Sequence, residues 1–201
     1  MRKSETFLLL CLFLSALVIV NCHIQNSNAL RIVEINDGNP LYVDILDRWT
    51  YTEEGEVVEV ETYSDWYANV EVVYVERGSG LPTYPTPYTA RITEYTVTFT
   101  DITPTPPGET PSPVSLAPVK GNCNFLITAD PEAKKGVVQS LKIIPKEWCV
   151  MHEGDVEEGR VLKAKITLKG TDEISGKEVS DEGYLTIDIG NYEDDPNKRG
   201  E

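Results

Sequence analysis

VLKAKITLKGTDEISGKEVSDEGYLTIDI, residues 161–189, is the stretch with the clearest strand pattern in this sequence. Apolar residues occupy every second position of its two arms, namely Leu162, Ala164, Ile166 and Leu168 in the first and Leu185, Ile187 and Ile189 in the second. A period of two places alternate side chains on one face of a strand. Between the arms, Gly170 and the Ser175-Gly176 pair supply turn residues. The stretch therefore predicts a β-hairpin with one apolar face, which a second sheet must cover because a lone hairpin is marginally stable in water.

Short apolar or alternating runs upstream predict the strands that would cover this face. They are residues 30–36, 41–46, 48–52, 56–63, 66–77, 92–100, 124–128 and 137–144. The first two flank the turn cluster Asp37-Gly38-Asn39-Pro40 and are expected to pair as a hairpin, and 66–77 is expected at the centre of a sheet. No sustained amphipathic helix pattern is found. About eight or nine short strands indicate an all-β fold, an antiparallel β-sandwich of immunoglobulin-like or fibronectin-like architecture.

Proline-rich stretches set the expected domain organisation. Residues 78–88 cannot continue a strand ladder, because proline lacks the amide donor. Residues 102–118 contain six prolines and form either one long loop or a domain linker. The loop is preferred, since neither side holds enough strands for a sandwich of its own. One β-sandwich domain is therefore expected over residues 30–192, followed by a charged tail, 193–201.

The N-terminus has the pattern of an export signal. Arg2 and Lys3 precede the uncharged run FLLLCLFLSALVIV, residues 7–20. This run matches the core of a signal peptide and is too short to span a bilayer comfortably. The sequence therefore predicts an exported protein with residues 1–21 as its signal peptide.

Two cleavage sites compete at the end of this signal. Cys22 resembles the lipidated cysteine of a bacterial lipobox, although Asn21 stands where a small residue is usual. A lipid on Cys22 would attach the chain to a membrane of the cell envelope, outside the cytoplasm, with residues 22–29 as a short tether. Cleavage after Ala29 would instead give a soluble secreted protein, and an uncleaved signal would remain as an anchor.

Cysteine usage and charge agree with export. Cys11 belongs to the signal and Cys22 is the candidate for lipidation, which leaves Cys123 and Cys149 as an even pair in an oxidising compartment. A structural disulfide between these two cysteines is expected. The formal net charge of −15 disfavours nucleic acid and anionic lipid headgroups as partners.

The C-terminal half resembles a known group of exported proteins. ITEYTVTFT, residues 92–100, is followed by a proline-rich loop and by LKAKITLKGTDEISGKEVSDEGYLTIDIGNYED, residues 162–194. This arrangement is similar to that of uncharacterised exported bacterial lipoproteins with an immunoglobulin-like sandwich, with Gly170, Gly176 and Gly183 at matching positions. The resemblance implies the fold and an envelope location, and it carries no activity with it.

Sequence patterns for catalysis are missing. His23 and His152 are the only histidines, and Gly78-Ser79-Gly80 is not the GxSxG elbow of a hydrolase. The many Asp and Glu residues leave an acid-pair hydrolase open, but no spacing selects two of them. No calcium loop, phosphate-binding loop or CxxC pair occurs. The sequence therefore predicts a protein that is not an enzyme and has no metal site or cofactor.

The remaining bias is a gathering of Trp and Tyr residues between positions 49 and 88. Exposed rings on a sheet stack on sugars or anchor protein partners, and rings in the core or in loops only pack. The candidate ligand-binding residues are Trp49, Trp66, Tyr67, Tyr84 and Tyr88. The sequence thus predicts a non-enzymatic cell-envelope lipoprotein with a structural or protein-binding role. A carbohydrate-binding module that uses these aromatic residues is the alternative.

Overall fold

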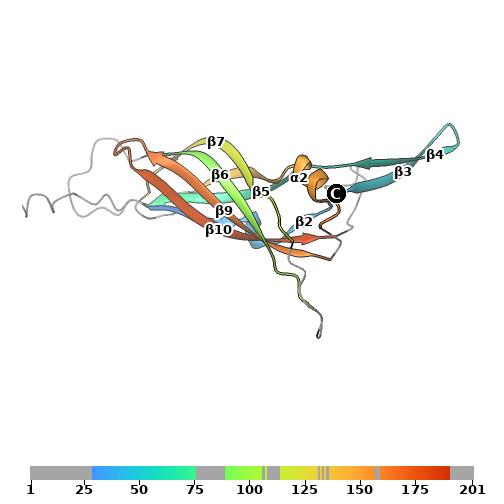
Figure 1. Cartoon of the computed structure of the whole chain (residues 1–201). Coiled ribbons are helices and arrows are strands. Elements are labelled where there is room, and N and C mark those ends of the chain that lie inside the picture. The colour runs from blue at the N-terminus through green and yellow to red at the C-terminus, as the bar shows by residue number, and fades with distance from the viewer. Residues whose placement is uncertain are drawn as a thin grey trace, which may run out of the picture.

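The structure of this chain is a computed structural model, and it describes residues 29–75, 89–105, 107, 114–130, 132, 134, 136–156 and 159–190. Its elements in chain order are β1 (Ala29–Ile35), the 3₁₀ turn η1 (Asn36–Gly38), β2 (Leu41–Val43), β3 (Asp47–Glu53), β4 (Glu56–Thr62), β5 (Trp66–Val75), β6 (Thr89–Asp101), β7 (Val119–Thr128), β8 (Val137–Ile144), the helix α2 (Lys146–His152), β9 (Val161–Asp172) and β10 (Glu178–Ile189). The signal peptide, Cys22 and the charged tail lie outside the described residues. Strands dominate the described chain, which confirms the expected all-β class (Figure 1).

The described strands form three sheets. The first has the strand order β1-β5-β8, the second has the order β2-β10-β9-β6-β7, and the third is the β3–β4 pair. The pairings between these strands are antiparallel except that of β2, which runs parallel to β10. The segment expected at the centre of a sheet, residues 66–77, contains β5, which is the central strand of the first sheet.

The hairpin predicted over residues 161–189 is confirmed as β9 and β10. The cross-strand register places Leu185 opposite Ala164 and Ile187 opposite Leu162, and all four side chains are buried. The other edge of β9 pairs with β6, so β9 is hydrogen-bonded on both sides. The apolar alternation of this stretch is therefore the alternation of a strand pair at the middle of a sheet.

Two of the glycines in this hairpin lie where another strand approaches closely. A Cβ atom added to Gly170 on β9 would lie 2.1 Å from the carbonyl oxygen of Arg91 on β6. A Cβ atom added to Gly183 on β10 would lie 2.6 Å from Cδ1 of Ile35, because β1 packs across β10 at this point. Glycine in a strand interior often marks a place where another group approaches closely, and both positions fit that description.

One hydrophobic core is shared by the two larger sheets. Its side chains include Val70, Val72 and Tyr74 of β5, Leu141 and Ile143 of β8, Tyr95 and Val97 of β6, and the apolar residues of β9 and β10. Tyr95 Oη donates a hydrogen bond to the carbonyl oxygen of Lys142 on β8 (2.9 Å). Tyr74 donates to the carboxylate of Asp172, and both side chains are almost completely buried. Each tyrosine therefore places its ring in the core and links one sheet to the other through its hydroxyl.

The expected hairpin of residues 30–36 with residues 41–46 is wrong. β1 pairs with β5 in the first sheet and β2 pairs with β10 in the second, so the chain changes sheets between them. The change occurs at η1, where Asn36 and Asp37 both have a φ of 52°. The turn cluster bends the chain, but a local turn does not determine the partner of each arm when longer strands elsewhere offer more hydrogen bonds.

The sequence pattern does not predict the helix α2. This helix buries Trp148, Cys149 and His152. Trp148 Nε1 donates to the carbonyl oxygen of Ala117 (2.8 Å), and the Ala117 amide donates to His152 Nε2 (3.2 Å). These two bonds hold the end of the proline-rich segment 102–118 against the core, where Ala117 packs. A helix of seven residues is too short to show a clear hydrophobic period, which is why the pattern misses it.

The expected disulfide is also wrong, because Cys123 and Cys149 are both free. Cys123 lies on the edge strand β7, whereas Cys149 lies in α2 with its Sγ atom 3.9 Å from the carbonyl oxygen of Ser64. Burial raises the pKa of the Cys123 thiol to about 11 and that of the Cys149 thiol to about 12. An even number of cysteines does not by itself bring two Cβ atoms into the facing arrangement that a disulfide requires.

Candidate functional site

The strands β3 and β4 form a hairpin that stands apart from the two larger sheets. Asp47–Glu53 pairs residue by residue with Glu56–Thr62, and the turn residues Glu54 and Gly55 have φ values of 50° and 89°. Two consecutive positive φ values are typical of a two-residue hairpin turn, and glycine adopts the second without strain. Figure 1 shows the hairpin extending beyond the other strands at the end of the molecule where α2 lies. The two strands predicted on either side of this turn are therefore confirmed.

The pairing register divides this hairpin into two unlike faces. One face carries Trp49 opposite Val60 and Tyr51 opposite Val58, and we call these four side chains the apolar face. The other face is polar except for Val57, and it holds Arg48, Thr50, Thr52, Glu59 and Glu61. The hairpin thus has the amphipathic pattern of a strand pair that packs on one side.

The apolar face is not part of the protein core. Among the described residues, none of its four side chains belongs to the hydrophobic core or to the residues packed against it. In the same part of the chain, β3 and β4 make extended contacts with each other and with no other strand or helix. Tyr51 is 45% exposed, and the other three side chains are half-buried. Since a two-stranded hairpin alone is marginally stable in water, this face has the composition of a contact surface.

Polar contacts tie the base of the hairpin to the domain. Ser64 Oγ donates to Oδ2 of the buried Asp47 (2.5 Å). Tyr63 Oη donates to Oε2 of Glu153, the residue that follows α2 (2.7 Å). The hydrogen bond to the Glu153 carboxylate raises the pKa of Tyr63 above its ordinary value. These contacts fix the direction in which the hairpin leaves the domain.

The tip of the hairpin is strongly acidic. An open pocket of about 360 Å³ at the turn is lined by Glu53, Glu54, Glu56 and Val58. Residues 48–61 contain five glutamates and one arginine, Arg48. That arginine is paired with Glu61 on the polar face (Nε to Oε1 2.8 Å). The apolar face therefore ends in a region of negative potential.

The structure separates the aromatic residues that the sequence names as candidates. Trp49 lies in the apolar face of the hairpin. Trp66, at the start of β5, packs against the core, whereas Tyr67 is 49% exposed. Tyr84 and Tyr88 lie outside the described residues. The described candidates therefore lie on two different elements and differ in exposure.

Three residues of the apolar face, Tyr51, Val58 and Val60, are not among the candidates named from the sequence. The signal that could have found them is an alternation of apolar residues on both sides of Glu54-Gly55, the same kind of pattern as in residues 161–189. The pattern shows that a face is apolar, and only the structure shows that the described chain leaves it outside the core.

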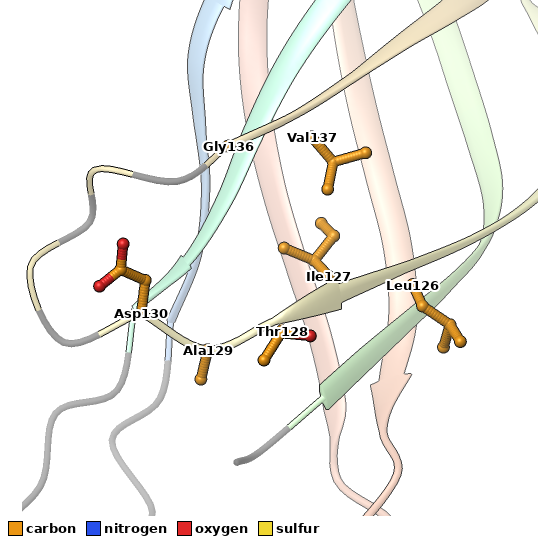
Figure 2. Close-up of a pocket in the computed structure, with 7 residues that line it drawn as sticks. All are labelled: Leu126, Ile127, Thr128, Ala129, Asp130, Gly136 and Val137. Atoms are coloured by element: carbon orange, nitrogen blue, oxygen red, sulfur yellow. The ribbon is translucent and has the colours of Figure 1, made fainter.

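A second open pocket, of about 450 Å³, lies between the end of β7 and the start of β8. Figure 2 shows the side chains of Ile127 and Val137 close together in this pocket and Asp130 on the connecting loop. The Asp130 carboxylate accepts hydrogen bonds from the amides of Glu132 (3.0 Å) and Lys134 (3.1 Å) in its own loop. Because its charged group holds the loop, this pocket lacks the convergent polar groups that orient a ligand.

The side chain of His152, which could act in catalysis or bind a metal ion, makes its contacts within the domain. His152 Nε2 accepts from the Ala117 amide, and Nδ1 lies 3.1 Å from Oδ2 of Asp155. No group of three or more His, Cys, Asp or Glu side chains able to hold a metal ion is found among the described residues. Nor does that part of the chain contain a helix with the length and apolar composition needed to cross a membrane. The β3–β4 hairpin is therefore the feature with the clearest potential for an external contact.

No protein-family model, curated protein or solved structure matches this chain. The function is therefore inferred from the residues of the chain itself. Among the features described above, the β3–β4 hairpin combines an apolar face outside the core with a charged tip, and it supports the inference best.

Proposed function

We propose that this chain is a non-enzymatic exported protein, anchored to a membrane of the cell envelope through a lipid on Cys22, which binds a protein partner through the β3–β4 hairpin. The observation that carries the binding role is the apolar face, with Trp49 and Tyr51 on an element outside the core. Aromatic side chains are favoured at the centre of protein interfaces, where they bury a large area. A partner on this face would also supply the second layer that an isolated hairpin lacks.

The domain that presents the hairpin is, in this proposal, an immunoglobulin-like or fibronectin-like sandwich. The strand order supports this, since β10-β9-β6-β7 corresponds to strands G, F, C and C′ and β1-β5-β8 corresponds to strands A, B and E, in the same chain order. The β3–β4 hairpin is then an insertion between strands A and B. Such folds are scaffolds whose specific functions lie in loops and insertions.

The two ends of the domain have different roles in this proposal. Ala29, the first described residue, pairs with Val75 at one end of β5, whereas Trp66 at the other end lies close to the hairpin base in the sequence. The ten residues of β5 separate these ends by about 30 Å, at about 3.3 Å per residue. A lipid on Cys22 would therefore hold the domain by the end opposite the hairpin and present the hairpin away from that membrane.

Site-specific photo-crosslinking tests the binding role on the full chain in its native envelope. A photoreactive phenylalanine analogue replaces Tyr51 in the apolar face, and in a matched strain it replaces Tyr184, a tyrosine of β10 that is 57% exposed. The expected result is a discrete protein adduct from position 51 and none from position 184. Val58→Asp, which places a charge in the apolar face, is expected to remove the adduct. The binding role is wrong if position 51 gives no protein adduct or if both positions give the same adducts.

The anchor is tested by intact mass spectrometry on protein extracted from native membranes. A mature chain that starts at Cys22 and carries acyl mass is the expected result. A chain that starts at Leu30 without lipid would replace the anchored protein with a soluble secreted one. This measurement is independent of the crosslink, so each half of the proposal can fail alone.

The carbohydrate-binding alternative has less support from the described residues. A sugar platform uses aromatic rings that lie on one surface. Of the described candidates, Trp66 packs against the core and Tyr67 belongs to β5 rather than to the hairpin, so Trp49 shares its face with a single further ring, Tyr51, and with two valines. A protein partner is therefore the function that we propose. An adduct at position 51 that glycosidases remove would reverse this choice.

A further inference from the structure

We infer that the partner of the β3–β4 hairpin is a protein surface with an apolar centre and a rim of lysine or arginine side chains. This inference rests on the proposed function and deepens it by naming the chemistry of the partner. Its starting point is that the apolar face and the acidic tip form one surface. Glu53 and Glu56 are opposite each other in the register, two residues beyond Tyr51 and Val58 on the same strands, so all four lie on one side.

The apolar face decides the centre of the partner surface. The apolar face is continuous, because cross-strand neighbours and alternate residues of a strand lie side by side. Removing the apolar face from water is favourable only when it packs against a surface that is itself largely apolar. A partner that presents only hydrated charged groups would leave the apolar face in contact with water. The centre of the partner surface is therefore apolar.

Tyr51 and Glu53 together can bind a cationic side chain at the edge of the apolar face. Tyr51 Oη lies 3.4 Å from Oε2 of Glu53, so the carboxylate borders the ring. A lysine or arginine at this point gains an ion pair with the carboxylate and a cation–π contact with the ring. The same kind of contact exists elsewhere in this chain, where Lys163 Nζ lies 4.3 Å from the centre of the Tyr184 ring. The rim of the partner surface is therefore basic.

The charge of the hairpin disfavours the other classes of occupant. Residues 48–61 contain five glutamates and one arginine, and that arginine is already paired with Glu61. Phosphate backbones and anionic headgroups would be repelled by this surface. A second copy of the chain, with its formal net charge of −15, would bring an identical acidic tip against the first. A protein surface with an apolar centre and basic residues around it would cover the apolar face and pair with the glutamates at the tip.

The test measures the adduct from position 51 in isolated native envelopes that contain the full chain. Glu53→Lys with Glu56→Lys inverts the two charges that share a side with the apolar face, and Glu34→Lys with Glu178→Lys inverts two exposed glutamates outside the hairpin, so the two variants have equal net charge. The adduct yield is expected to fall at least about tenfold in the first variant and less than about twofold in the second. Added salt is expected to lower the wild-type yield, because exposed charges are screened. The crosslinked peptide of the partner is expected to carry lysine or arginine beside apolar residues.

Several outcomes separate this inference from the proposed function. Equal adduct yields from the two charge variants, an adduct with twice the mass of the chain, or an acidic crosslinked peptide would overturn the basic partner and leave hairpin binding in place. No protein adduct from position 51 would instead end the proposed function itself. The unfolding midpoints of both variants are measured alongside, and they are expected to match the wild type because the four positions are exposed.

Discussion

The hairpins β9–β10 and β3–β4 are built on the same sequence pattern and end in different environments. Both alternate apolar and polar residues around a turn that contains a glycine with positive φ, Gly176 in one and Gly55 in the other. The apolar side of β9–β10 lies in the core that the two larger sheets share, whereas that of β3–β4 lies outside it. β9 is paired with strands on both edges, and in the described chain β3 is paired on one.

The contrast shows what an alternating pattern does and does not determine. Alternation decides which side of a strand is apolar, because side chains point to opposite faces in turn. It contains no information about what lies opposite that side. For β9–β10 the cover includes Ile32 and Ile35 of β1, which pack against Gly183. An apolar face that remains outside the core of its own domain is expected to find its cover in another protein.

Hydrogen exchange on the native protein should give the largest difference between the two hairpins. The amides of β9 are expected to exchange only by global unfolding, because this strand is central and its apolar side is buried. The amides of β3 and β4 are expected to exchange by local opening, which costs far less free energy than global unfolding. Mass spectrometry of peptides after timed exchange measures both. Equal protection of the two hairpins would mean that β3–β4 already has a cover within the chain.

A truncation in each hairpin should separate them by stability. Leu168→Ala on β9 removes a side chain that is fully buried, and it is expected to lower the free energy of unfolding by about 2–5 kcal/mol. Val58→Ala on β4 is the control from the apolar face and is expected to cost about 0.5 kcal/mol or less. Urea unfolding of the full chain measures both. Similar losses for the two variants would contradict the contrast.

Close packing should make the protein sensitive to a substitution at one glycine of β9–β10, Gly170. Gly170→Ala places a methyl group 2.1 Å from the backbone oxygen of Arg91, and the required shift of β6 is expected to cost about 1–3 kcal/mol. Gly154→Ala is the control, because nothing lies within 4 Å of its added Cβ. Thermal unfolding of the two variants checks the difference. A wild-type midpoint for Gly170→Ala would show that β6 and β9 are not held this close.

The smallest expected effect concerns the turn of β9–β10, which is tied to the other sheet by Asp172. Its carboxylate accepts from Tyr74 and from the amides of Ile174 and Ser175. Burial opposes ionisation, but these hydrogen bonds outweigh it, and the pKa of Asp172 lies below its ordinary value of 3.8. Asp172→Asn is expected to cost about 1 kcal/mol at neutral pH.

The pH dependence of this effect follows from the direction of the pKa shift. The folded state binds the proton of Asp172 less tightly than the unfolded chain, so the ionised group stabilises the fold above about pH 4. That contribution is lost as the pH falls through the lowered pKa. The gap between wild type and Asp172→Asn is therefore expected to shrink in acid, as measured by urea unfolding over a range of pH. If the difference in unfolding free energy between wild type and Asp172→Asn does not change with pH, the charge of Asp172 does not contribute to stability.

Much of the strand content could be predicted because it depends on local pattern. The alternation in residues 161–189 and the central position of 66–77 are both found in the structure. The pairing of 30–36 with 41–46 failed, because the partner of a strand is decided by segments far away in the sequence. The disulfide failed for the same reason, since the distance between Cys123 and Cys149 is a property of the packed chain.

The candidate site shows the same division. Trp49 could be named from the sequence because aromatic residues are rare and their gathering is visible. Tyr51 belongs to the same gathering, whereas Val58 and Val60 look like ordinary strand residues, and the register places all three on one face with Trp49. Trp66 was named on the same evidence as Trp49, yet it packs against the core. Exposure depends on the surroundings of a residue, which its type does not reveal.

Residue order alone determined that this chain forms strands, where its turns fall, which side of each strand is apolar, and that the β3–β4 turn is acidic. These properties follow from interactions between residues a few positions apart. The tertiary structure decided which strands share a sheet, that the backbone of β6 leaves no room for a side chain at Gly170, and that one apolar face is left outside the core. Those outcomes depend on contacts between distant segments, where burial of apolar surface and the fit of side chains select one arrangement among many.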